Sequence, residues 1–410
     1  MSTAVLDHVR RHHRMALPAY VTDHAALASH AAAVRDALPA SVELLYAAKA
    51  NPDPAVLQTL RAHIDGVEVA SGGELRHVAA AVPGLPLSFG GPGKTDAELA
   101  LAVESGVHRL HVESERELHV LARLAANSEP VEVLLRVNAP LQVPGAPLAM
   151  GGGPSPFGLD PSRLDAAADL VARSPGLRLR GLHLHLASGL DAAACGDVAA
   201  QAVPWVLRWA SRTGHRVEEL DLGGGMAVDY ADPEARFDWP AYGACLAVLA
   251  KLHPSLQLKI EPGRSLTAYA ACYVTRVLDV KRSYGRAFAI LEGGTHHLRT
   301  PAARGHDQPC TVVPVDDWTG APVRPAVVGE PVTLVGQLCT PRDVLARDVP
   351  LATLRAGDVV VFAMAGAYAW NISHTSFLMH PPPQFVHLPA HVHDAAEGRP
   401  LGGDLNHAGG

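Results

Sequence analysis

The chain has 410 residues, of which 48% are hydrophobic and 18% charged, so it can bury a large core. Its 34 Lys and Arg against 41 Asp and Glu give a net charge of −7 with no basic block, which argues against nucleic acid as a partner. No apolar run is long enough to cross a membrane, and residues 1–15 lack the apolar stretch of a signal peptide. The cysteines are scattered and include no C-x-x-C pair, which favours reduced thiols, so we expect a cytoplasmic protein.

The larger, N-terminal part of the chain alternates short apolar segments with helical stretches. A helix is predicted to start at Thr22 or Asp23, either of which can cap it, and to run through the Ala-rich residues that follow. Strands that alternate with helices indicate a parallel sheet, and eight such units predict a closed (β/α)8 barrel, an α/β fold. The eight predicted strands are Val42–Ala48, Gly66–Val69, Pro86–Phe89, Arg109–Val112, Glu132–Val137, Arg180–Leu186, Glu219–Leu222 and Gln257–Ile260.

Polar residues follow the ends of these strands. Lys49 follows the first predicted strand, Gly223–Gly225 the seventh and Glu261 the eighth, while His185 and Ser188 close the sixth. Barrel enzymes build their active sites at the carboxyl ends of the strands, where polar groups can meet without breaking the packed interior. We therefore expect these residues to converge on one site.

The pattern of apolar and polar residues changes beyond residue 270. Apolar segments separated by turn residues, with little helical periodicity, indicate a β-rich region. We expect a barrel over 22–270 and a β-rich domain made of 1–21 and 271–386. The Pro/Gly-rich segment 139–161 is expected to be a long surface loop, and 387–410 a disordered tail.

The segment YAAKANP places Lys49 at the end of a buried strand. A lone lysine in such a position is commonly a snorkelling side chain or one half of a structural ion pair. The alternative is a nucleophilic lysine, whose amine is deprotonated by partial desolvation and attacks a carbonyl group to form a Schiff base. Read alone, the segment leaves both interpretations open.

An ordered set of segments carries a resemblance to a known family. The segments are YAAKANP, VEVASGGEL, GPGKTDAEL, GLHLHLAS, LDLGGGMAVDY, IEPGRS, GGTHHLRTPA, GQLCTPRD and AGAYAW, and the likeness extends from about Leu17 to Val386. The set resembles the fold-type III pyridoxal-phosphate decarboxylases, the family of the diaminopimelate and ornithine decarboxylases. The resemblance implies an alanine-racemase-like (β/α)8 barrel followed by a β-rich C-terminal domain, pyridoxal 5′-phosphate as the cofactor, and a homodimer with shared active sites.

The resemblance also assigns residues to the cofactor. It implies that Lys49 forms the Schiff base, that Glu261 keeps the pyridine nitrogen protonated, and that His185 stacks on the ring. Racemase-type relatives carry an Arg at the ring nitrogen, so Glu261 favours decarboxylation over racemisation. Glycines let the backbone approach a ligand closely, and a guanidinium suits a dianionic phosphate. The residues expected at the phosphate are Ser188, Gly224, Gly225, Gly263 and Arg264, with Tyr368 reaching it from the partner subunit.

Residues beyond the barrel are assigned to the reaction and the substrate. Cys339 matches the family cysteine that is supplied across the dimer interface and returns a proton to the substrate carbon, a task for which Lys49 is the other candidate. Asp343 matches the family Asp that faces the substrate amine. His296, His297 and Arg299 are candidates for the substrate pocket.

Two further observations concern the barrel itself. Glu68 and Arg136 occupy positions that support the cofactor site in the family. We expect no metal site, because the adjacent histidine pairs of the sequence lack Cys or carboxylate partners at zinc spacing.

Departures from the family pattern bear on the substrate. Diaminopimelate decarboxylases typically read C-E-S-G-D and place an Arg directly before the Pro that matches Pro301, whereas this chain has Thr340 and Thr300 there. GGTHHLRTPA, CTPRDVLARDV and AWNISHTSFLMHP instead resemble the siderophore-biosynthesis branch, whose members decarboxylate an amino acid joined to citrate, such as citryl-diaminopropionate. One alternative is a decarboxylase of free ornithine, diaminobutyrate or diaminopimelate. Another is a non-catalytic cofactor-binding or regulatory homologue, which the presence of Lys49, Cys339 and Asp343 disfavours.

Overall fold

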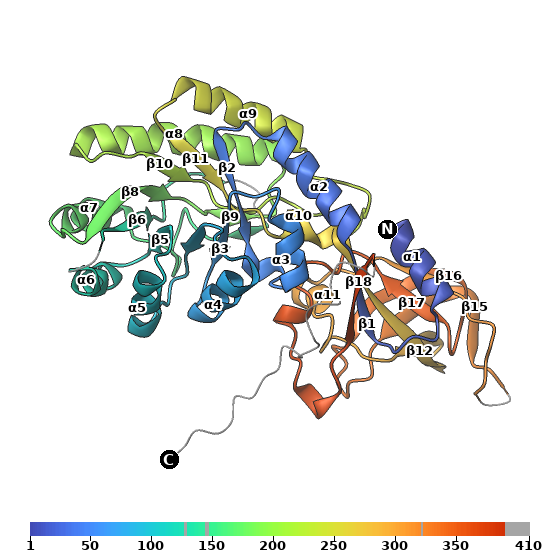
Figure 1. The fold of residues 1–410 in the computed structure, drawn as a ribbon. Coiled ribbons are helices and arrows are strands. Elements are labelled where there is room, and N and C mark those ends of the chain that lie inside the picture. The colour runs from blue at the N-terminus through green and yellow to red at the C-terminus, as the bar shows by residue number, and fades with distance from the viewer. Residues whose placement is uncertain (127–128, 144–146, 321–322, 390–410) are drawn as a thin grey trace, which may run out of the picture.

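Eight parallel strands close into a barrel in the order β10-β11-β2-β3-β4-β5-β6-β8 (Figure 1). This computed structural model describes residues 1–126, 129–143, 147–320 and 323–389. The predicted barrel and each of its eight predicted strands are confirmed. The largest difference is that the sixth strand ends at His183, so His185 lies beyond it. The strands are β2 Val42–Ala47, β3 Gly66–Val69, β4 Leu87–Phe89, β5 Arg109–Val112, β6 Val131–Arg136, β8 Leu177–His183, β10 Glu219–Asp221 and β11 Gln257–Ile260.

Helices cover the outside of the barrel (Figure 1). The carboxylate of Asp23 accepts the backbone N–H of Ala26 at 2.9 Å, so Asp23 caps the first of them as predicted. Thr95 and Glu98 form a reciprocal capping box at the start of α5. The helices are α2 His24–Ala37, α3 Pro54–Leu60, α4 Gly72–Ala81, α5 Asp96–Glu104, α6 Glu115–Leu124, α7 Leu164–Ala172, α8 Ala192–Thr213, α9 Trp239–Leu252 and α10 Arg264–Thr267.

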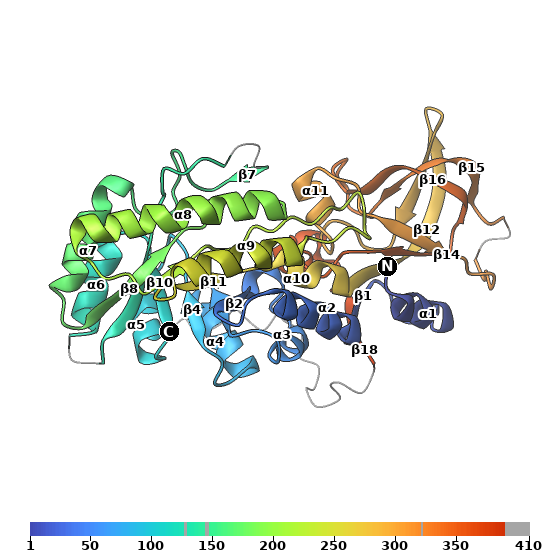
Figure 2. The same cartoon turned by 90° about the horizontal axis from the view of Figure 1, so that it is seen from above.

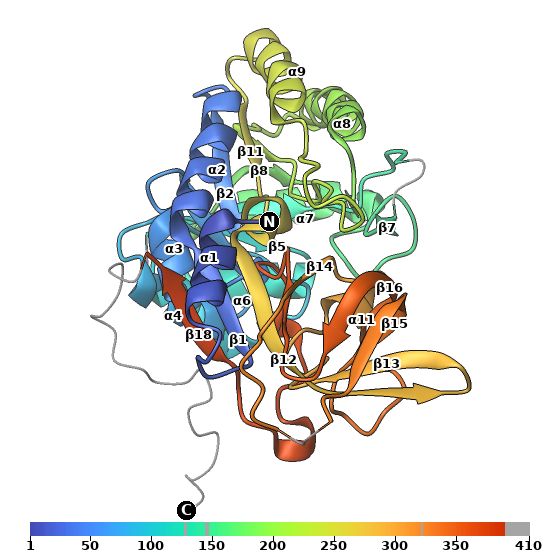
Figure 3. The same ribbon diagram turned by 90° about the vertical axis from the view of Figure 1, so that its right-hand side faces the viewer.

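A β-rich domain lies against one end of the barrel (Figures 1 and 3). Its strands follow the order β14-β17-β12-β13-β15-β16, and β1 joins this sheet by pairing with β12 and with β18. Two short helices, α1 Thr3–Arg11 and α11 Thr300–Arg304, belong to this part of the molecule. The strands are β1 Ala19–Asp23, β12 Ala271–Ser283, β13 Arg286–Leu291, β14 Cys310–Val313, β15 Ala326–Val335, β16 Val344–Arg355, β17 Val359–Phe362 and β18 Gln384–Leu388.

The two ends of the described chain meet in this sheet. β1 runs antiparallel to β12 and parallel to β18, with Ala19 opposite Val274 and Gln384. These pairings agree with our grouping of 1–21 with 271–386, which stays a proposal for the domain limits. β1 continues to Asp23 and β18 to Leu388, beyond those limits. The remainder of the expected tail, 390–410, lies outside the described residues.

A small strand pair links the segment 139–161 to the site. β7 Leu148–Ala149 pairs with β9 Ala187–Ser188, so part of this segment lies against the strand that carries Ser188. Residues 144–146 of the segment lie outside the described residues. Among those described, no helix is both long and apolar enough to cross a membrane.

Candidate active site

Lys49 lies in a single 3-10 turn, Ala48–Ala50, directly after β2. The β-rich domain holds the backbone of this turn, because the Asn371 side chain donates to the Lys49 carbonyl at 2.7 Å and the Tyr368 N–H donates to the Ala50 carbonyl at 2.7 Å. Tyr368 has a φ of 49°, a left-handed conformation that costs a non-glycine residue about 1–2 kcal/mol. Its contact with the lysine turn offsets this strain and fixes the position of the amine.

The amine of Lys49 forms an ion pair with Glu68, a buried residue of β3. Burial by itself lowers the pKa of Lys49, but the carboxylate of Glu68 outweighs burial and holds this pKa above its ordinary value. The amine is therefore protonated in this arrangement. It becomes a nucleophile after losing a proton, and Glu68 is in contact to accept it.

Glu261 follows β11 at the mouth of the barrel and is 5% exposed. Its Oε1 has no hydrogen-bond partner among the described residues. Burial, followed by the negative charge of Glu68, raises the pKa of Glu261 to about 7. A buried carboxyl group without a partner is costly, so Glu261 presents a binding point for a donor that the chain does not supply.

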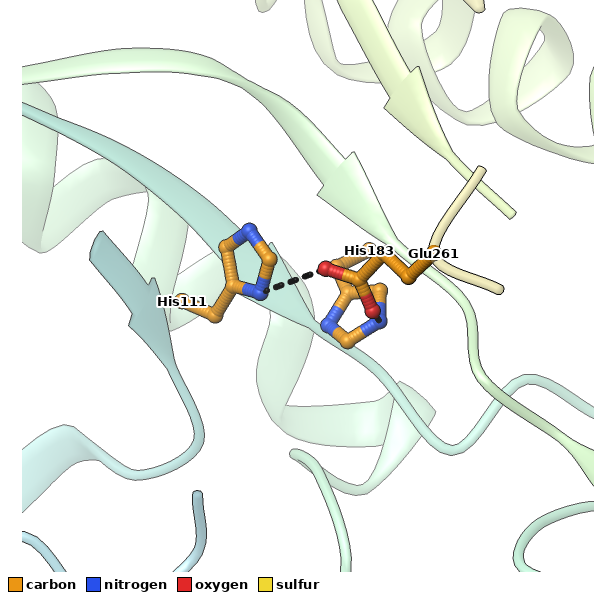
Figure 4. A group of neighbouring side chains, drawn as sticks. All are labelled: His111, His183 and Glu261. Atoms are coloured by element: carbon orange, nitrogen blue, oxygen red, sulfur yellow. Dashed lines mark ion pairs between the residues drawn. The ribbon is translucent and has the colours of Figure 1, made fainter. Parts of the chain in front are cut away.

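Two histidines flank this carboxyl group (Figure 4). Nε2 of His183, at the end of β8, lies 3.4 Å from Glu261, and Nδ1 of His111, in β5, lies 3.7 Å from it. Burial lowers the pKa of both histidines well below its ordinary range, so both rings are neutral. Asp221 lies 3.9 Å from His111, and burial followed by the charge of Glu261 raises the pKa of Asp221 well above its ordinary value. The cluster therefore holds carboxyl groups that are poised to keep protons.

One atom from each of His111, His183 and Glu261 lies within 4.8 Å of the others, a spacing that could hold a metal ion. We expected no metal site, and the sequence does not reveal this group because its members come from separate strands. The charges of Lys49 and Glu68 both act on Glu261, so the cluster lies beside the lysine turn. His111 and Asp221 were not anticipated. For His111 the available signal was a histidine inside the otherwise largely apolar predicted strand Arg109–Val112.

His185 packs on the glycine turn that follows β10. Its Nδ1 accepts the N–H of Gly224 at 3.0 Å, so Nε2 carries the ring proton. Gly223 has a φ of 69°, and a Cβ there would lie 2.5 Å from Nδ1 of the same ring. Burial, followed by the positive charge of Arg136, lowers the pKa of His185 well below its ordinary value. The site thus offers a neutral, flat ring that suits stacking on an aromatic cofactor.

The glycine turn and Arg264 form a cradle for an anion. A Cβ on Gly224 would lie 2.3 Å from the Glu261 carbonyl, and one on Gly225 would lie 2.2 Å from the carbonyl of Ala187. Arg264 donates to the Tyr230 hydroxyl at 2.9 Å, and no ion pair joins it to a carboxylate among the described residues. A guanidinium without a counter-ion beside a turn that admits only glycine fits a dianionic phosphate.

Tyr368 belongs to the site of its own chain. Its ring lies 4.5 Å from the Arg264 guanidinium, and its backbone contacts the lysine turn. The expectation that it reaches the phosphate from the partner subunit is therefore wrong. A motif identifies the residue, but it does not say which subunit delivers it.

The other residues expected at the phosphate and around the ring lie close by. Ser188 is partly exposed in β9. A Cβ on Gly263 would lie 2.9 Å from that of Ala50, so this glycine lets the loop pack on the lysine turn. Arg136 forms a buried ion pair with Glu113 at 2.8 Å. These contacts connect the ends of β2, β6 and β11 around one space.

The two residues expected from the β-rich domain, Cys339 and Asp343, differ in whether their side chains are free to contact a ligand. Cys339 is exposed in the loop after β15, and no hydrogen bond or ion pair joins it to a barrel residue among those described. Asp343 is 2% exposed, and its two oxygens accept the N–H groups of Thr295 at 2.6 Å and Leu338 at 2.8 Å. Because Asp343 ties two loops together with both oxygens, the structure corrects its expected role of facing the substrate amine.

The three candidates for the substrate pocket also differ in whether their side chains are already bonded within the chain. His297 uses both ring nitrogens within the chain, with the Tyr273 hydroxyl and the Pro381 carbonyl each at 3.0 Å. His296 is fully buried, neither of its ring nitrogens has a partner among the described residues, and burial followed by His297 lowers its pKa to about 3. Arg299 is exposed at the start of α11. Of the three, His296 and Arg299 keep groups that a ligand could use.

The combination of groups at the strand ends of this barrel is that of a pyridoxal-phosphate enzyme. The groups are a lysine, an unpartnered buried carboxyl group, a neutral histidine ring and an anion cradle. These residues fit the amine-reactive carbon, the pyridine nitrogen, the ring face and the phosphate of that cofactor. Residues 24–268 match the family model described as "Pyridoxal-dependent decarboxylase, pyridoxal binding domain".

Known proteins place the chain more closely. It is 37% identical to the 2-[(L-alanin-3-ylcarbamoyl)methyl]-2-hydroxybutanedioate decarboxylase of Staphylococcus aureus, over 90% of this chain and 93% of that protein. It is 32% identical to the L-glutamyl-[BtrI acyl-carrier protein] decarboxylase of Niallia circulans, over 90% and 88% of the two chains. The structure of diaminopimelate decarboxylase from Helicobacter pylori shares the fold, with a TM-score of 0.82 over 93% of this chain and 94% of that one, at 22% identity.

The chain belongs to the pyridoxal-dependent decarboxylases. Pyridoxal phosphate is its cofactor, and decarboxylation of an amino acid is its reaction class.

Proposed function

We propose that this enzyme decarboxylates a diamino acid joined to citrate, of the citryl-diaminopropionate type, in the assembly of a siderophore. The observation that carries the proposal is the likeness to the Staphylococcus aureus enzyme, whose name describes such a conjugate and which matches along almost the whole chain. Thr340 and Thr300 support it, because diaminopimelate decarboxylases typically carry a Glu that reads the distal end of the substrate at the first position and an Arg at the second. The free thiols agree with action in the cytoplasm.

The residues around Lys49 prepare the amine. Glu68 holds the protonated amine in place and takes its proton, which leaves a nucleophile pointing into the site. The bound cofactor supplies an electron-accepting ring, which takes up the electron pair released when the substrate carboxylate leaves as CO2.

The residues around Glu261 keep that ring an effective acceptor. With a ring N–H opposite it, Glu261 becomes the carboxylate that holds the proton at the pyridine nitrogen. Nε2 of His183 lies 3.4 Å from the other carboxyl oxygen, which places a neutral ring beside Glu261. His185 would cover a face of the bound ring, and Arg264 with the glycine turn would hold the phosphate.

The last step returns a proton to the substrate carbon. We propose that Cys339 of the partner subunit donates it, because the thiol is exposed on its own chain and makes no described contact with the barrel. The enzyme is then a two-fold homodimer, with each site assembled from Lys49 of one chain and Cys339 of the other.

Product analysis tests the substrate. The holoenzyme is incubated with citryl-diaminopropionate, ornithine, diaminobutyrate and diaminopimelate in parallel, and the products are identified by mass spectrometry. We expect loss of CO2 from the citrate conjugate. Turnover of a free diamino acid with none of the conjugate would establish the alternative, which the likeness to diaminopimelate decarboxylases favours. Absence of turnover on any amino acid would favour a non-catalytic homologue.

Subunit exchange tests the shared site. Lys49→Ala and Cys339→Ala are each expected to be poorly active alone. After reversible dissociation and mixing, random pairing makes about half of the dimers mixed, and each mixed dimer has one intact site, so about a quarter of all sites recover. An active monomer, or no recovery after confirmed exchange, would show that each site is built within one chain.

A further inference from the structure

Inside the barrel, a second carboxyl group lies against that of Glu261. Asp221 is the last residue of β10, where it pairs with Lys259 of β11, and Glu261 directly follows β11. Figure 2 shows these two strands side by side, close to α9. The Glu261 N–H donates to the Gly223 carbonyl at 2.9 Å, and the side chains of Asp221 and Glu261 are in hydrogen-bonding contact. Two acidic groups therefore share one buried space.

This contact lacks a donor when both groups are ionised. Asp221 is fully buried, and neither its Oδ2 nor Oε1 of Glu261 has a hydrogen-bond partner among the described residues. The ring nitrogens of His111 lie 3.9 Å from Asp221 and 3.7 Å from Glu261, which is too far for hydrogen bonds. Because an ionised carboxylate only accepts, a proton on one of the two acids is the donor that the contact requires.

The cation that acts on Asp221 is already paired. The amine of Lys259 lies 2.9 Å from both Glu219 and Glu43, at the amino end of the barrel. Burial keeps the ring of His111 neutral, so this ring brings no positive charge to the two acids. Two carboxylates in contact in a buried space repel each other strongly, so one acid keeps a proton.

Asp221 is the better holder of that proton. It is 0% exposed, whereas Glu261 lies at the mouth of the barrel and is 5% exposed. Burial, followed by the charge of Glu261, raises the pKa of Asp221 well above its ordinary value. The positive charge of Lys49 favours the ionised form of Glu261 and partly offsets its burial. Oδ1 of Asp221 accepts the Gly223 N–H at 2.8 Å, which leaves Oδ2 to carry the proton.

We infer that Asp221 is a positioning residue that keeps its proton and donates it to the Glu261 carboxylate. A hydrogen bond to a carboxylate favours its ionised form, so Asp221 keeps Glu261 available as a counter-charge and fixes its orientation. The location of the proton rests on the contacts alone. Its use in the reaction rests on the proposed role of Glu261 at the pyridine nitrogen.

Infrared spectroscopy at pH 8 locates the proton, in the holoenzyme and in the cofactor-free protein. Asp221→Asn keeps the size of the side chain and removes its acid group. The control is Asp307→Asn, at an exposed aspartate that is paired with Arg347. We expect the wild type to show a carboxylic acid band that Asp221→Asn lacks, whereas Asp307→Asn should lose carboxylate absorbance only. Loss of carboxylate absorbance alone in Asp221→Asn would overturn the inference.

Turnover tests whether the donor matters to the reaction. Asp221→Leu removes the donor at similar volume, and we expect turnover to fall about 10- to 100-fold, the range for one hydrogen bond to a charged group. Asp221→Asn should recover most of this loss, because its amide donates to Glu261 and its carbonyl still accepts the Gly223 N–H. An equal loss in both variants would show that Asp221 acts as a charge. Normal turnover in the folded fraction of Asp221→Leu would show a purely structural role. Either result would contradict the inference.

The inference and the role of Glu261 fail separately. If Asp221 gives the acid band but Glu261→Gln decarboxylates like the wild type, the protonated Asp221 stands and the role of Glu261 at the ring nitrogen fails. If the band is absent while Glu261→Gln is slow, Glu261 keeps its role and the inference about Asp221 fails. Stoichiometric zinc in the purified protein would also overturn the inference, because a cation among His111, His183 and Glu261 would let both acids ionise.

Discussion

The two ends of the barrel use charged residues in opposite ways. At the amino ends of the strands, Arg109 of β5 forms ion pairs with Glu219 and Glu132, and the buried Lys259 lies 2.9 Å from both Glu219 and Glu43. Each buried charge of this end has a partner of opposite sign. At the carboxyl ends, Glu261 and the histidines beside it are just as buried, yet Oε1 of Glu261 and the ring nitrogens of His111 and His183 have no hydrogen-bond partners in the described chain.

The pKa values reflect the same contrast. Burial tends to raise the pKa of Glu219, but the hydrogen bond from Arg109 and the charge of Lys259 outweigh it and lower the pKa to about 2. For Glu261, burial and the negative charge of Glu68 outweigh the positive charge of Lys49, and its pKa rises to about 7. At the amino ends of the strands, paired charges stabilise the barrel. At the carboxyl ends, the unpaired polar groups are available to a ligand. This division matches the general separation of stability and catalysis between the two faces of such barrels.

The largest effect is expected from the residue that should carry covalent chemistry. Lys49→Ala should abolish turnover, with a loss of at least about 10³-fold, because it removes the nucleophile and a proton carrier together. Steady-state decarboxylation assays measure it. Lys251→Ala, at an exposed position on α9, is the control and should be fully active. Substantial activity in Lys49→Ala would remove Lys49 from the chemistry.

A substitution at the paired end should cost stability instead of activity. Glu219→Gln leaves the buried Arg109 and Lys259 short of a counter-charge, and we expect the free energy of unfolding to fall by about 3–5 kcal/mol. Urea denaturation measures it, with the more exposed Glu330→Gln as a control that should lose no more than about 1 kcal/mol. The folded fraction should keep normal turnover. A variant that is stable but inactive would contradict the division between the two ends.

The matching substitution at the unpaired end should cost rate. Glu261→Gln keeps the phosphate contacts, so the cofactor should still bind, but the ring nitrogen loses the charge that holds its proton. Removing one such electrostatic interaction costs about 10²–10³ in turnover. Turnover close to that of the wild type would mean that Glu261 does not face the pyridine nitrogen.

The smallest effect concerns the dependence of stability on pH in the cofactor-free protein. The pKa of Glu261 rises from 4.5 to about 7 on folding, so its contribution is intact below pH 4.5 and is lost as the pH rises through 7. Glu261→Gln removes this penalty and should be more stable than the wild type at pH 8 by about 1–3 kcal/mol, with no gain at pH 4. For Glu219 the sign is reversed, because its lowered pKa gives stability that is lost as the pH falls from 4.5 toward 2. Urea denaturation at both pH values measures these differences, and equal stability of wild type and Glu261→Gln at pH 8 would count against the raised pKa.

The barrel was predictable because its strands are short, apolar and separated by helices, a pattern that a single sequence displays directly. Helix α1 was not predicted, because Val5 and Val9 are its buried residues and give a weak signal within a polar segment. The cluster of His111, His183 and Glu261 was missed for another reason. Its members are far apart in sequence and meet only when the barrel closes.

The ordered motifs located most of the site, but they could not assign contacts. Asp343 stands in the right motif, yet both of its oxygens are bound by backbone N–H groups, which depends on how two loops meet. Tyr368 was found but placed in the wrong subunit.

Reduction of the holoenzyme with borohydride, followed by peptide mapping, tests the central claim that the unpaired end of the barrel is the cofactor site. Borohydride converts a Schiff base into a stable secondary amine, so the lysine that carries the cofactor keeps a pyridoxyl group. The chain contains five lysines, Lys49, Lys94, Lys251, Lys259 and Lys281. Lys94 pairs with Glu117 and Lys259 with Glu219, both in buried ion pairs. We predict that the label is found on the peptide that contains Lys49, and labelling of any other lysine in its place would contradict the account.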